Sequence, residues 1–224
     1  PFVARYRKEA TGALDEVALQ TIQEQAKKEQ ELFDRKNAVI KLIEAAGKLT
    51  APLQEKIQGA DDLATVEDLY LPYKQKRRTK AQVAKENGLM PLANWLLKYE
   101  TADPKTEAAH YVNQEVPDAE AALAGAHEIL AEGIAEMATV RSWLRNYTTE
   151  HGRLEVAVKK DGEQLDERGV YEQYYDFSEQ VSQLSSYQIL AINRGEKEKI
   201  LRVKVVADPT TVTNYLNFRL VRGH

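Results

Sequence analysis

The residues best placed to do chemistry in this sequence are six cations that follow Tyr73 and precede the next acid, Glu86. They are Lys74, Lys76, Arg77, Arg78, Lys80 and Lys85. Such a run on a proline-containing loop that leads into a short helix favours phosphate binding, because side-chain cations and free backbone N–H groups converge there. Tyr73 adds a ring on which an exposed base can stack. Six phosphate contacts predict a log–log salt slope of about −5 on duplex DNA.

Two other interpretations of this basic segment stay open. The cations can pair with acids elsewhere in the chain, and residues 101–150 supply nine acidic and only three basic side chains. They can also contact an acidic protein partner. Arg5 and Arg7 form a second, weaker group of candidates for phosphate contact, and Arg5 and Lys8 are expected to share a helical face.

A third basic group near the C-terminus alternates in sign. Arg194, Lys197 and Lys199 are interleaved with Glu196 and Glu198. Interleaved charges are typical of a solvated or self-paired helix surface. This group is therefore a weaker candidate for phosphate contact than the basic segment.

Motifs of common enzyme classes are absent from the sequence. The histidines His110, His127, His151 and His224 are not spaced as metal ligands on a helix. There is no Walker phosphate loop, no glycine-rich dinucleotide motif and no Gly-x-Ser-x-Gly elbow. The acidic pair Glu67-Asp68 diverges by about 100° on a helix and does not face one site. We therefore expect no catalytic residues, no metal and no cofactor.

Composition excludes several further classes. The chain has 224 residues, a net charge of −4 and no cysteine, which argues against a globally basic nucleic-acid binder, a disulfide scaffold and thiol catalysis. The lack of cysteine fits a reducing compartment, and we expect a cytoplasmic location. No apolar run approaches the roughly 18 to 20 residues of a membrane span. Because the first residue is Pro1 and no signal peptide follows, we expect a piece of a longer protein.

Few glycines and prolines and long periodic runs predict a mostly α fold. One long amphipathic helix is expected between Gly12 and Gly47, and a second helical stretch over 118–150, which Gly125 and Gly133 are able to divide. Shorter helices are expected to begin near Thr50, at Asp61 or Asp62 and then Thr65, at Thr79 and at Pro91. Leu71-Pro72-Tyr73 is expected to break the helix that contains residues 66–70. The seven-residue spacing of Leu123, Leu130, Met137 and Leu144 favours packing within a bundle over a coiled coil between chains.

After His151-Gly152 the pattern changes. A short strand or extended arm is expected near 154–158, and a strand near 200–206. An aromatic cluster is expected over 171–177. Helices are expected over Ser186–Arg194, ending at Gly195, and over Thr210–Arg222. The predicted architecture is a multi-helix bundle with two long helices over residues 1–150, followed by a smaller mixed unit with short strands over 151–224.

Three stretches carry a resemblance to a known family. They are Pro1–Gly12 (PFVARYRKEATG), Leu69–Thr79 (LYLPYKQKRRT) and Ile189–Glu198 (ILAINRGEKE). In order and spacing the chain resembles the N-terminal helical region of the bacterial Tex family of transcription accessory proteins. Two departures are that Ser186-Tyr187-Gln188 stands where the family commonly has a Ser-His-Arg-like run, and that the family's first helices are missing.

The resemblance implies a longer protein that continues into an inactive ribonuclease-H-like domain, helix-hairpin-helix motifs and a C-terminal OB-type RNA-binding domain, none of which lies in this chain. It also implies a non-enzymatic transcription accessory factor that binds RNA or DNA without sequence preference, of which this is the scaffold portion. RNA polymerase or ribosome-associated machinery are further expected partners, and a membrane is not. The alternative is a protein-interaction scaffold that docks other domains or the polymerase without touching nucleic acid.

Overall fold

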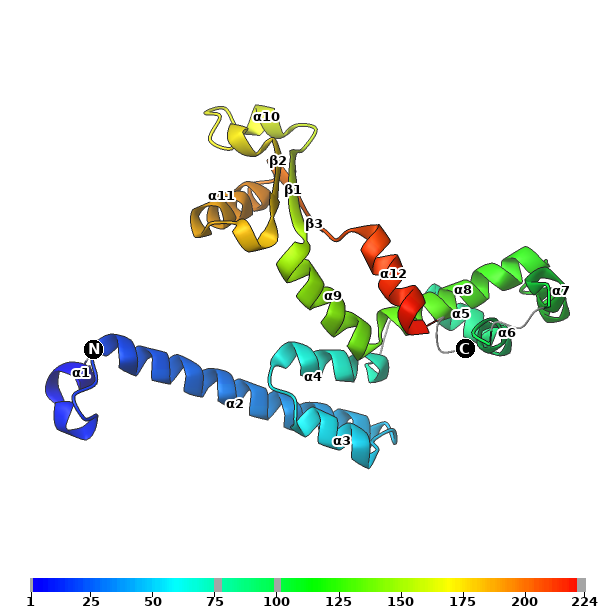
Figure 1. Ribbon diagram of the computed structural model, residues 1–224, viewed down its shortest axis with the longest axis horizontal. Coiled ribbons are helices and arrows are strands. Elements are labelled where there is room, and N and C mark those ends of the chain that lie inside the picture. Colours follow the sequence, from blue (N-terminus) through cyan, green and yellow to red (C-terminus); the bar gives the residue numbers. More distant parts are fainter. Residues whose placement is uncertain (1, 75–77, 99–101, 221–224) are drawn as a thin grey trace. The chain divides into compact units, whose positions relative to one another are not determined.

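The computed structural model describes residues 2–74, 78–98 and 102–220. Over these ranges the chain is mostly helical, with one three-stranded antiparallel sheet toward the C-terminus (Figure 1). This confirms the predicted fold class. The chain divides into two compact units, Pro1–Ala138 and Thr139–His224. The domain boundary expected after residue 150 stays a prediction, and the two units are described separately below.

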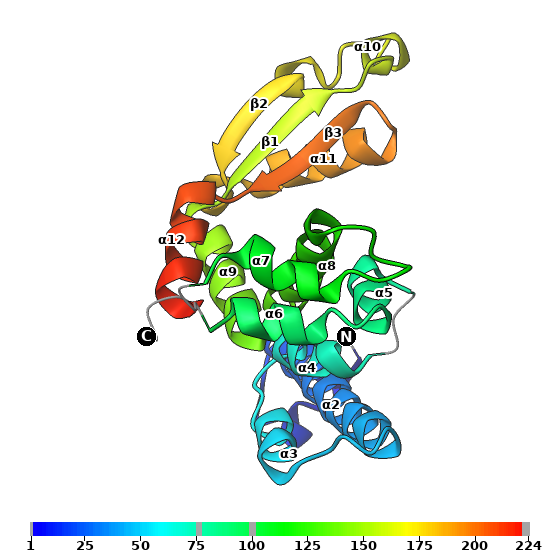
Figure 2. The ribbon, with the colours of Figure 1, turned by 90° about the vertical axis from the view of Figure 1, so that its right-hand side faces the viewer.

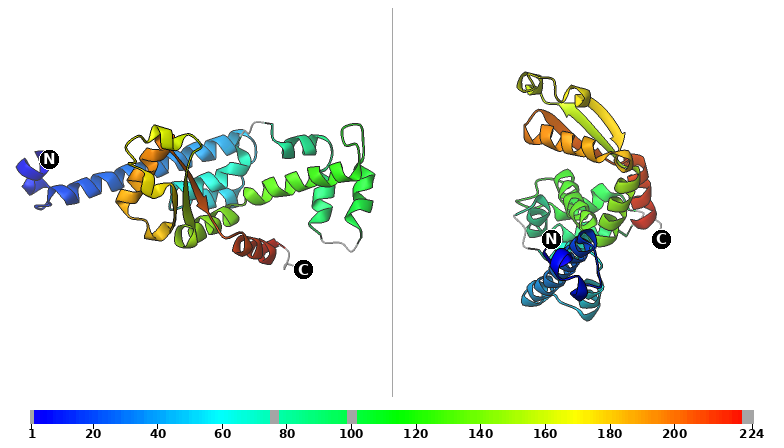
Figure 3. Two further views of the ribbon diagram at one scale, coloured as in Figure 1. Left: turned by 90° about the horizontal axis from the view of Figure 1, so that it is seen from above. Right: turned by 90° about the vertical axis from the view of Figure 1, so that its left-hand side faces the viewer.

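Unit 1 begins with a short helix and one long one. Helix α1 (Phe2–Tyr6) and the 3-10 turn η1 (Lys8–Ala10) lead into α2 (Glu16–Ala45), whose first turns are dark blue in Figure 3. The Asp15 carboxylate caps α2 by accepting a hydrogen bond from Ala18 N at 2.7 Å. Gly47, with φ of +67°, follows its end. The long helix expected between Gly12 and Gly47 is confirmed.

The C-terminal half of α2 forms a first core with α3 (Ala51–Gln58) and α4 (Leu63–Tyr70). The fully buried side chains of this core include Val39, Ile43, Ile57 and Val66. Asp62 caps α4 through Thr65 N at 2.7 Å, which confirms the helix start expected there. Helix α4 ends at Tyr70, so Leu71-Pro72-Tyr73 breaks it as expected, and these three residues form the 3-10 turn η2 (Leu71–Tyr73).

A second core joins α5 (Lys80–Glu86), α6 (Met90–Leu96), α7 (Pro104–Ala108), the turn η3 (Ala109–Tyr111) and α8 (Ala119–Ala135). Leu92, Ala93 and Ala126 are among its fully buried side chains. Helix α8 passes very close to Leu89, the residue before α6, because a Cβ atom added at Gly125 would lie 2.3 Å from Leu89 Cδ1. A glycine is therefore required by packing at this position.

The second long helical stretch is divided, but at a different place from the one expected. Helix α8 runs through both Gly125 and Gly133 without a break and ends at Ala135. Helix α9 (Ala138–His151) begins after Glu136 and Met137. Close packing against Leu89 accounts for Gly125 inside α8, whereas a Cβ atom added at Gly133 would meet nothing within 4 Å, so packing does not account for that glycine.

Unit 2 contains a sheet of strand order β2-β1-β3, in which β1 is the central strand (Figure 2). The strands are β1 (Arg153–Val158), β2 (Asp176–Gln180) and β3 (Leu201–Val206). Both pairs are antiparallel, with Val156 opposite Phe177 on one side and Val203 on the other. Strand β2 was not expected from the sequence, whereas β1 and β3 were.

Between β1 and β2 lie α10 (Gly162–Leu165) and the turn η4 (Glu172–Tyr174), and after β2 the turn η5 (Val181–Gln183) leads to α11 (Ser186–Lys197). Helix α11 covers one face of the sheet and forms a third core around Ile192, Leu201 and Tyr174. It passes through Gly195 instead of ending there. Helix α12 (Pro209–Leu220) meets α9 where the Tyr215 and Trp143 rings stack at 3.7 Å between centroids.

Candidate nucleic-acid interface

The predicted basic segment connects the first core of unit 1 to the second. Lys74 follows η2 in an extended conformation and is exposed. Lys76 and Arg77 lie outside the described residues. Arg78 is exposed and precedes Thr79. The Thr79 hydroxyl caps α5 by accepting a hydrogen bond from Gln82 N at 3.0 Å. Since α5 is only seven residues long and this cap already satisfies Gln82 N, the side-chain cations are the main chemical feature of this connection.

The described cations on either side of Thr79 pair with carboxylates. Arg78 Nη2 lies 2.7 Å from Glu86 Oε2, and Lys80 Nζ lies 3.6 Å from Glu128 Oε1 on α8. The side chains of Arg78 and Lys80 nevertheless remain 69% and 84% exposed. Hydrogen bonds from the Gln82 amide and from Arg78 lower the pKa of Glu86 below its ordinary value.

A less exposed pair anchors α5 to α8. Lys85 Nζ lies 3.1 Å from Glu132 Oε2, and their side chains are 32% and 16% exposed. The other oxygen of Glu132 accepts a hydrogen bond from the Thr79 hydroxyl at 2.9 Å. This carboxylate therefore ties both the cap and the last turn of α5 to α8, and Lys85 is held for structure rather than for a ligand.

The aromatic residues near the basic segment pack inward. Tyr70 and Tyr73 are partly buried against the first core. The Arg35 guanidinium lies 5.5 Å from the centre of the Tyr70 ring and is hydrogen-bonded to Glu67. That hydrogen bond lowers the pKa of Glu67 despite partial burial, which acts in the opposite direction. The Tyr70 ring thus takes part in a structural contact, and the role of Tyr73 as a base-stacking ring remains a prediction.

The second group of predicted cations lies at the N-terminus of unit 1. Arg5 is exposed in α1, and Arg7 Nε pairs with Glu9 Oε1 at 2.9 Å. Lys8 starts η1, after α1 has ended at Tyr6. The expectation that Arg5 and Lys8 share one helical face is therefore wrong, because the helix stops between them.

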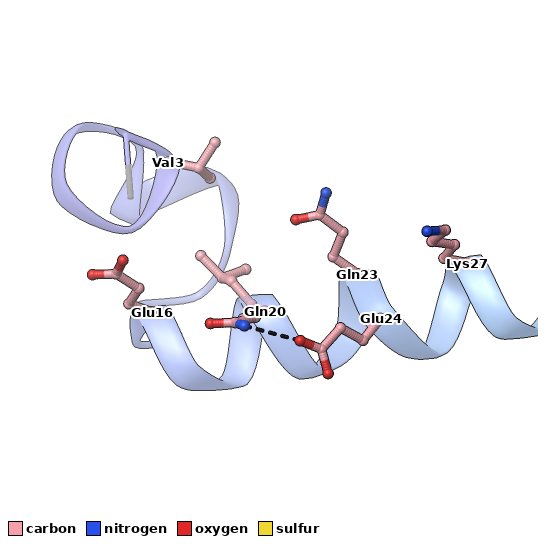
Figure 4. Close-up of a pocket in the computed structure, with 7 residues that line it drawn as sticks. Val3, Glu16, Gln20, Gln23, Glu24 and Lys27 are labelled. Carbon is pink, nitrogen blue, oxygen red and sulfur yellow. Dashed lines mark hydrogen bonds between the residues drawn. The ribbon is translucent and has the colours of Figure 1, made fainter. Parts of the chain in front are cut away.

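A cavity of about 590 Å³ opens between α1 and the first turns of α2 (Figure 4). Its lining is Val3, Glu16, Leu19, Gln20, Gln23, Glu24 and Lys27. The Gln20 side-chain amide donates a hydrogen bond to Glu24 Oε1 at 2.9 Å. Apart from Val3 of α1, these side chains follow one face of α2 and do not converge as an acid, a base and a nucleophile would.

The described residues hold no group of three or more His, Asp or Glu side chains arranged to bind a metal ion. Within the same ranges, no helix is both long and apolar enough to cross a membrane.

The Glu128 and Glu132 partners were not singled out by sequence reasoning, which identified only the acidic character of 101–150. Their four-residue spacing on a helix was an available signal, since it places two carboxylates on one face. It could not show that this face meets α5.

The geometry is that of a multi-helix scaffold with a small mixed unit and with exposed cations on one connection. A family model described as Tex central region-like matches residues 99–219, and one described as Tex-like protein N-terminal domain matches residues 1–44. The chain belongs to the Tex family, as the sequence resemblance indicated.

Named relatives are longer than this chain. Uncharacterized protein YdcI of Bacillus subtilis is 43% identical over 226 residues, which cover 100% of this chain and 31% of that protein. Transcriptional accessory protein Tex of Neisseria gonorrhoeae is 41% identical, covering 99% of this chain and 29% of that protein. Human S1 RNA-binding domain-containing protein 1 is 29% identical, covering 92% of this chain and 21% of that protein. The chain thus spans less than a third of the length of these curated relatives.

Proposed function

We propose that this chain is a non-enzymatic part of a nucleic-acid-associated transcription accessory factor, and that its basic segment contacts phosphates. The proposed contacts are Lys74, Lys76, Arg77, Arg78 and Lys80, with Arg5 and Arg7 as weaker ones. The observation that carries the proposal is the high exposure of Arg78 and Lys80, at 69% and 84% of the side chain, in spite of their ion pairs.

Surface ion pairs of this kind do not prevent phosphate binding. An exposed pair contributes only about 0 to 1 kcal/mol, because water and salt screen it. A polyanion that meets several cations gains in addition from the release of its condensed counterions. The Arg78–Glu86 and Lys80–Glu128 contacts are therefore exchangeable, whereas the less exposed Lys85–Glu132 contact stays in place.

The names of two relatives support the same class of function. One is named a transcriptional accessory protein and another an S1 RNA-binding domain-containing protein. For this chain, RNA or DNA without sequence preference is the proposed partner, and RNA polymerase or ribosome-associated machinery is a further one. The cysteine-free composition supports a cytoplasmic location.

A protein-interaction scaffold is the second candidate. The contacts of Lys80 and Lys85 with Glu128 and Glu132 favour it, because they use part of the basic segment to hold α5 against α8. In that case the exposed cations would bind an acidic protein surface or another domain and not a polyanion.

The experiment compares two five-site alanine variants. One replaces the five proposed contacts of the basic segment, and the other replaces exposed lysines elsewhere, namely Lys28, Lys41, Lys48, Lys56 and Lys160. Both lose the same charge. Fluorescence anisotropy then measures binding of labelled RNA, single-stranded DNA and duplex DNA at two salt concentrations.

We expect the first variant to bind more weakly than the second and to lose most of a salt slope of about −3.5, the value for five contacts on a single strand. Equal affinities and slopes for the two variants would remove the basic segment as the phosphate contact. No binding by the wild-type chain even at low salt would favour the scaffold.

A further inference from the structure

Helix α11 exposes an apolar surface that the proposed function does not use. Tyr187 and Leu190 are 69% and 68% exposed, and Ile189 is 42% exposed. Single exposed apolar residues are common, but Tyr187 and Leu190, three residues apart, lie side by side on one face of the helix, with Ile189 about 100° further round. Exposed apolar residues that adjoin in this way mark interaction sites.

The opposite side of α11 is firmly anchored. Ile192 is buried to 1% exposure in the third core, and Ala191 packs beside it. A Cβ atom added at Gly195 would lie 2.6 Å from Leu201 Cδ1 and 3.0 Å from Tyr171, so the helix sits directly on its neighbours. Since this face cannot leave the sheet without opening the core, α11 cannot rotate to cover its apolar residues (Figure 2).

Cations continue the exposed apolar surface along the same face. Tyr187, Leu190, Arg194 and Lys197 follow a spacing of three, four and three residues, which places them within about 80° around the helix axis and along about 15 Å of its length. Arg194 and Lys197 are exposed. Glu198, close to them in sequence, is used within unit 2, since it accepts a hydrogen bond from the Tyr171 hydroxyl at 3.0 Å.

We infer that this surface of α11 (Tyr187, Leu190, Arg194 and Lys197, flanked by Ile189) docks an acidic amphipathic helix of a partner protein. The partner's apolar side chains pack on Tyr187 and Leu190, and its carboxylates meet Arg194 and Lys197. The i, i+3 and i, i+7 ridges of α11 are suited to packing against another helix.

A nucleic acid fits this surface less well. Tyr187 is the one ring of this surface on which a base can stack, whereas the aliphatic side chains of Leu190 and Ile189 contribute neither stacking nor a phosphate contact. Glu196, exposed on the flank of the helix, would repel a polyanion. The inference is thus independent of the basic segment in unit 1.

The test uses the 224-residue chain and synthetic fluorescein-labelled peptides. The first peptide has about 20 residues, long enough for a helix, with leucines on one face and glutamates beside them. The second carries lysine in place of each glutamate. Anisotropy measures their affinities, and labelled oligouridine serves as the nucleic-acid probe.

We expect the acidic peptide to bind and the basic peptide to bind much more weakly. Replacing Tyr187→Ser together with Leu190→Ser is expected to weaken the acidic peptide by at least about tenfold, as for residues at the centre of an interface. The matched control is Leu165→Ser, because Leu165 is 59% exposed in the same unit but away from α11. It is expected to bind the peptide as the wild type does.

A charge pair of variants tests complementarity separately. Lys197→Glu is expected to weaken the acidic peptide severalfold, whereas Lys204→Glu, on an exposed position of β3 opposite Glu155, is expected to leave it unchanged. Circular dichroism checks that the exposed substitutions keep the fold.

The inference is overturned if the acidic peptide does not bind, or if both peptides bind equally. It is also overturned if Leu165→Ser weakens binding as much as the α11 variant. If the α11 substitutions abolish binding of oligouridine instead of the peptide, the surface belongs to a nucleic acid.

Discussion

Asp166 is one of the two acidic side chains buried among the described residues, and it accepts several hydrogen bonds. Its carboxylate accepts hydrogen bonds from Val170 N at 2.8 Å, from Tyr171 N at 2.7 Å and from the Tyr175 hydroxyl at 3.1 Å. Burial acts to raise the pKa of Asp166, but the hydrogen bonds together lower it below the ordinary value. This single carboxylate therefore holds the aromatic cluster of unit 2 in place.

Replacing Asp166→Asn is expected to destabilise unit 2 in a pH-dependent way. Because the folded-state pKa of Asp166 is lowered, its ionised form stabilises the fold above the unfolded pKa of about 4. That contribution is lost as the pH falls through the folded pKa. The difference in unfolding free energy between wild type and Asp166→Asn should therefore be largest at neutral pH and shrink in acid.

Urea unfolding measures this difference, with Trp143 fluorescence as the signal in a Trp95→Phe background. The control is Asp161→Asn, since Asp161 is exposed and its side chain caps no helix. A difference that does not change between neutral and acidic pH would show that the hydrogen bonds do not depend on the charge of Asp166.

At the scale of elements, the structure contains two glycines in one helix with opposite surroundings. A Cβ atom at Gly125 would lie 2.3 Å from Leu89 Cδ1 and 3.3 Å from the Ala84 Cβ atom, whereas one at Gly133 would meet nothing within 4 Å. Leu89 is only 2% exposed, so it has little room to move aside. The same substitution should therefore have opposite effects at the two positions.

Gly133→Ala is expected to stabilise unit 1 by about 0.5 to 1 kcal/mol, because alanine favours the helix. Gly125→Ala gains the same propensity but overpacks the second core, at a cost of about 1 to 3 kcal/mol. Urea unfolding of the two variants, with Trp95 as the signal, tests this. Stabilisation by both substitutions would show that α8 can move away from α6 at little cost.

The elements that depend on local sequence were predictable. Asp15, Asp62 and Thr79 each cap a helix through a hydrogen bond within three residues, and such signals can be read without a fold. Strand β2 was missed because its residues, Asp176–Gln180, show no strong alternation and are extended only by pairing with β1. Gly195 was expected to end α11, but it lies inside the helix because tertiary packing requires a small residue there: a Cβ atom would lie 2.6 Å from Leu201 Cδ1.

The candidate interface divides in the same way. The cations of the basic segment follow one another in sequence, so their gathering was predictable. Their partners Glu128 and Glu132 lie about fifty residues further on, and only the packing of α8 against α5 brings them there. The exposed face of α11 could not be predicted either, because the sequence does not show which side of a helix the sheet covers.

At the scale of the whole molecule, the two tryptophans are divided between the two units. Trp95 packs against the second core in unit 1, and Trp143 stacks on Tyr215 in unit 2. The fluorescence of each tryptophan can therefore report the unfolding of its own unit when the other tryptophan is replaced by phenylalanine.

We expect each unit to unfold in a transition of its own. Leu92→Ala, at a fully buried position of unit 1, should destabilise the transition seen by Trp95 by about 2 to 5 kcal/mol and leave that of Trp143 unchanged. Ile192→Ala, in the third core, should destabilise the transition seen by Trp143 and leave that of Trp95 unchanged. Fluorescence-detected urea unfolding makes the comparison.

The exposed substitution Leu165→Ala serves as a control and is expected to shift neither transition. If Leu92→Ala and Ile192→Ala shift both reporters equally, the chain unfolds as one cooperative body.

The three cores follow one another along the chain without interleaving: the residues of the first lie between Leu32 and Tyr73, those of the second between Ala81 and Leu130, and those of the third between Leu154 and Val203. During synthesis each core is consequently complete in sequence before the next begins to emerge from the ribosome. No residue of these cores has to wait for a partner that belongs to a later core. Each core can therefore fold once its own residues have left the ribosome, beginning with the N-terminal one.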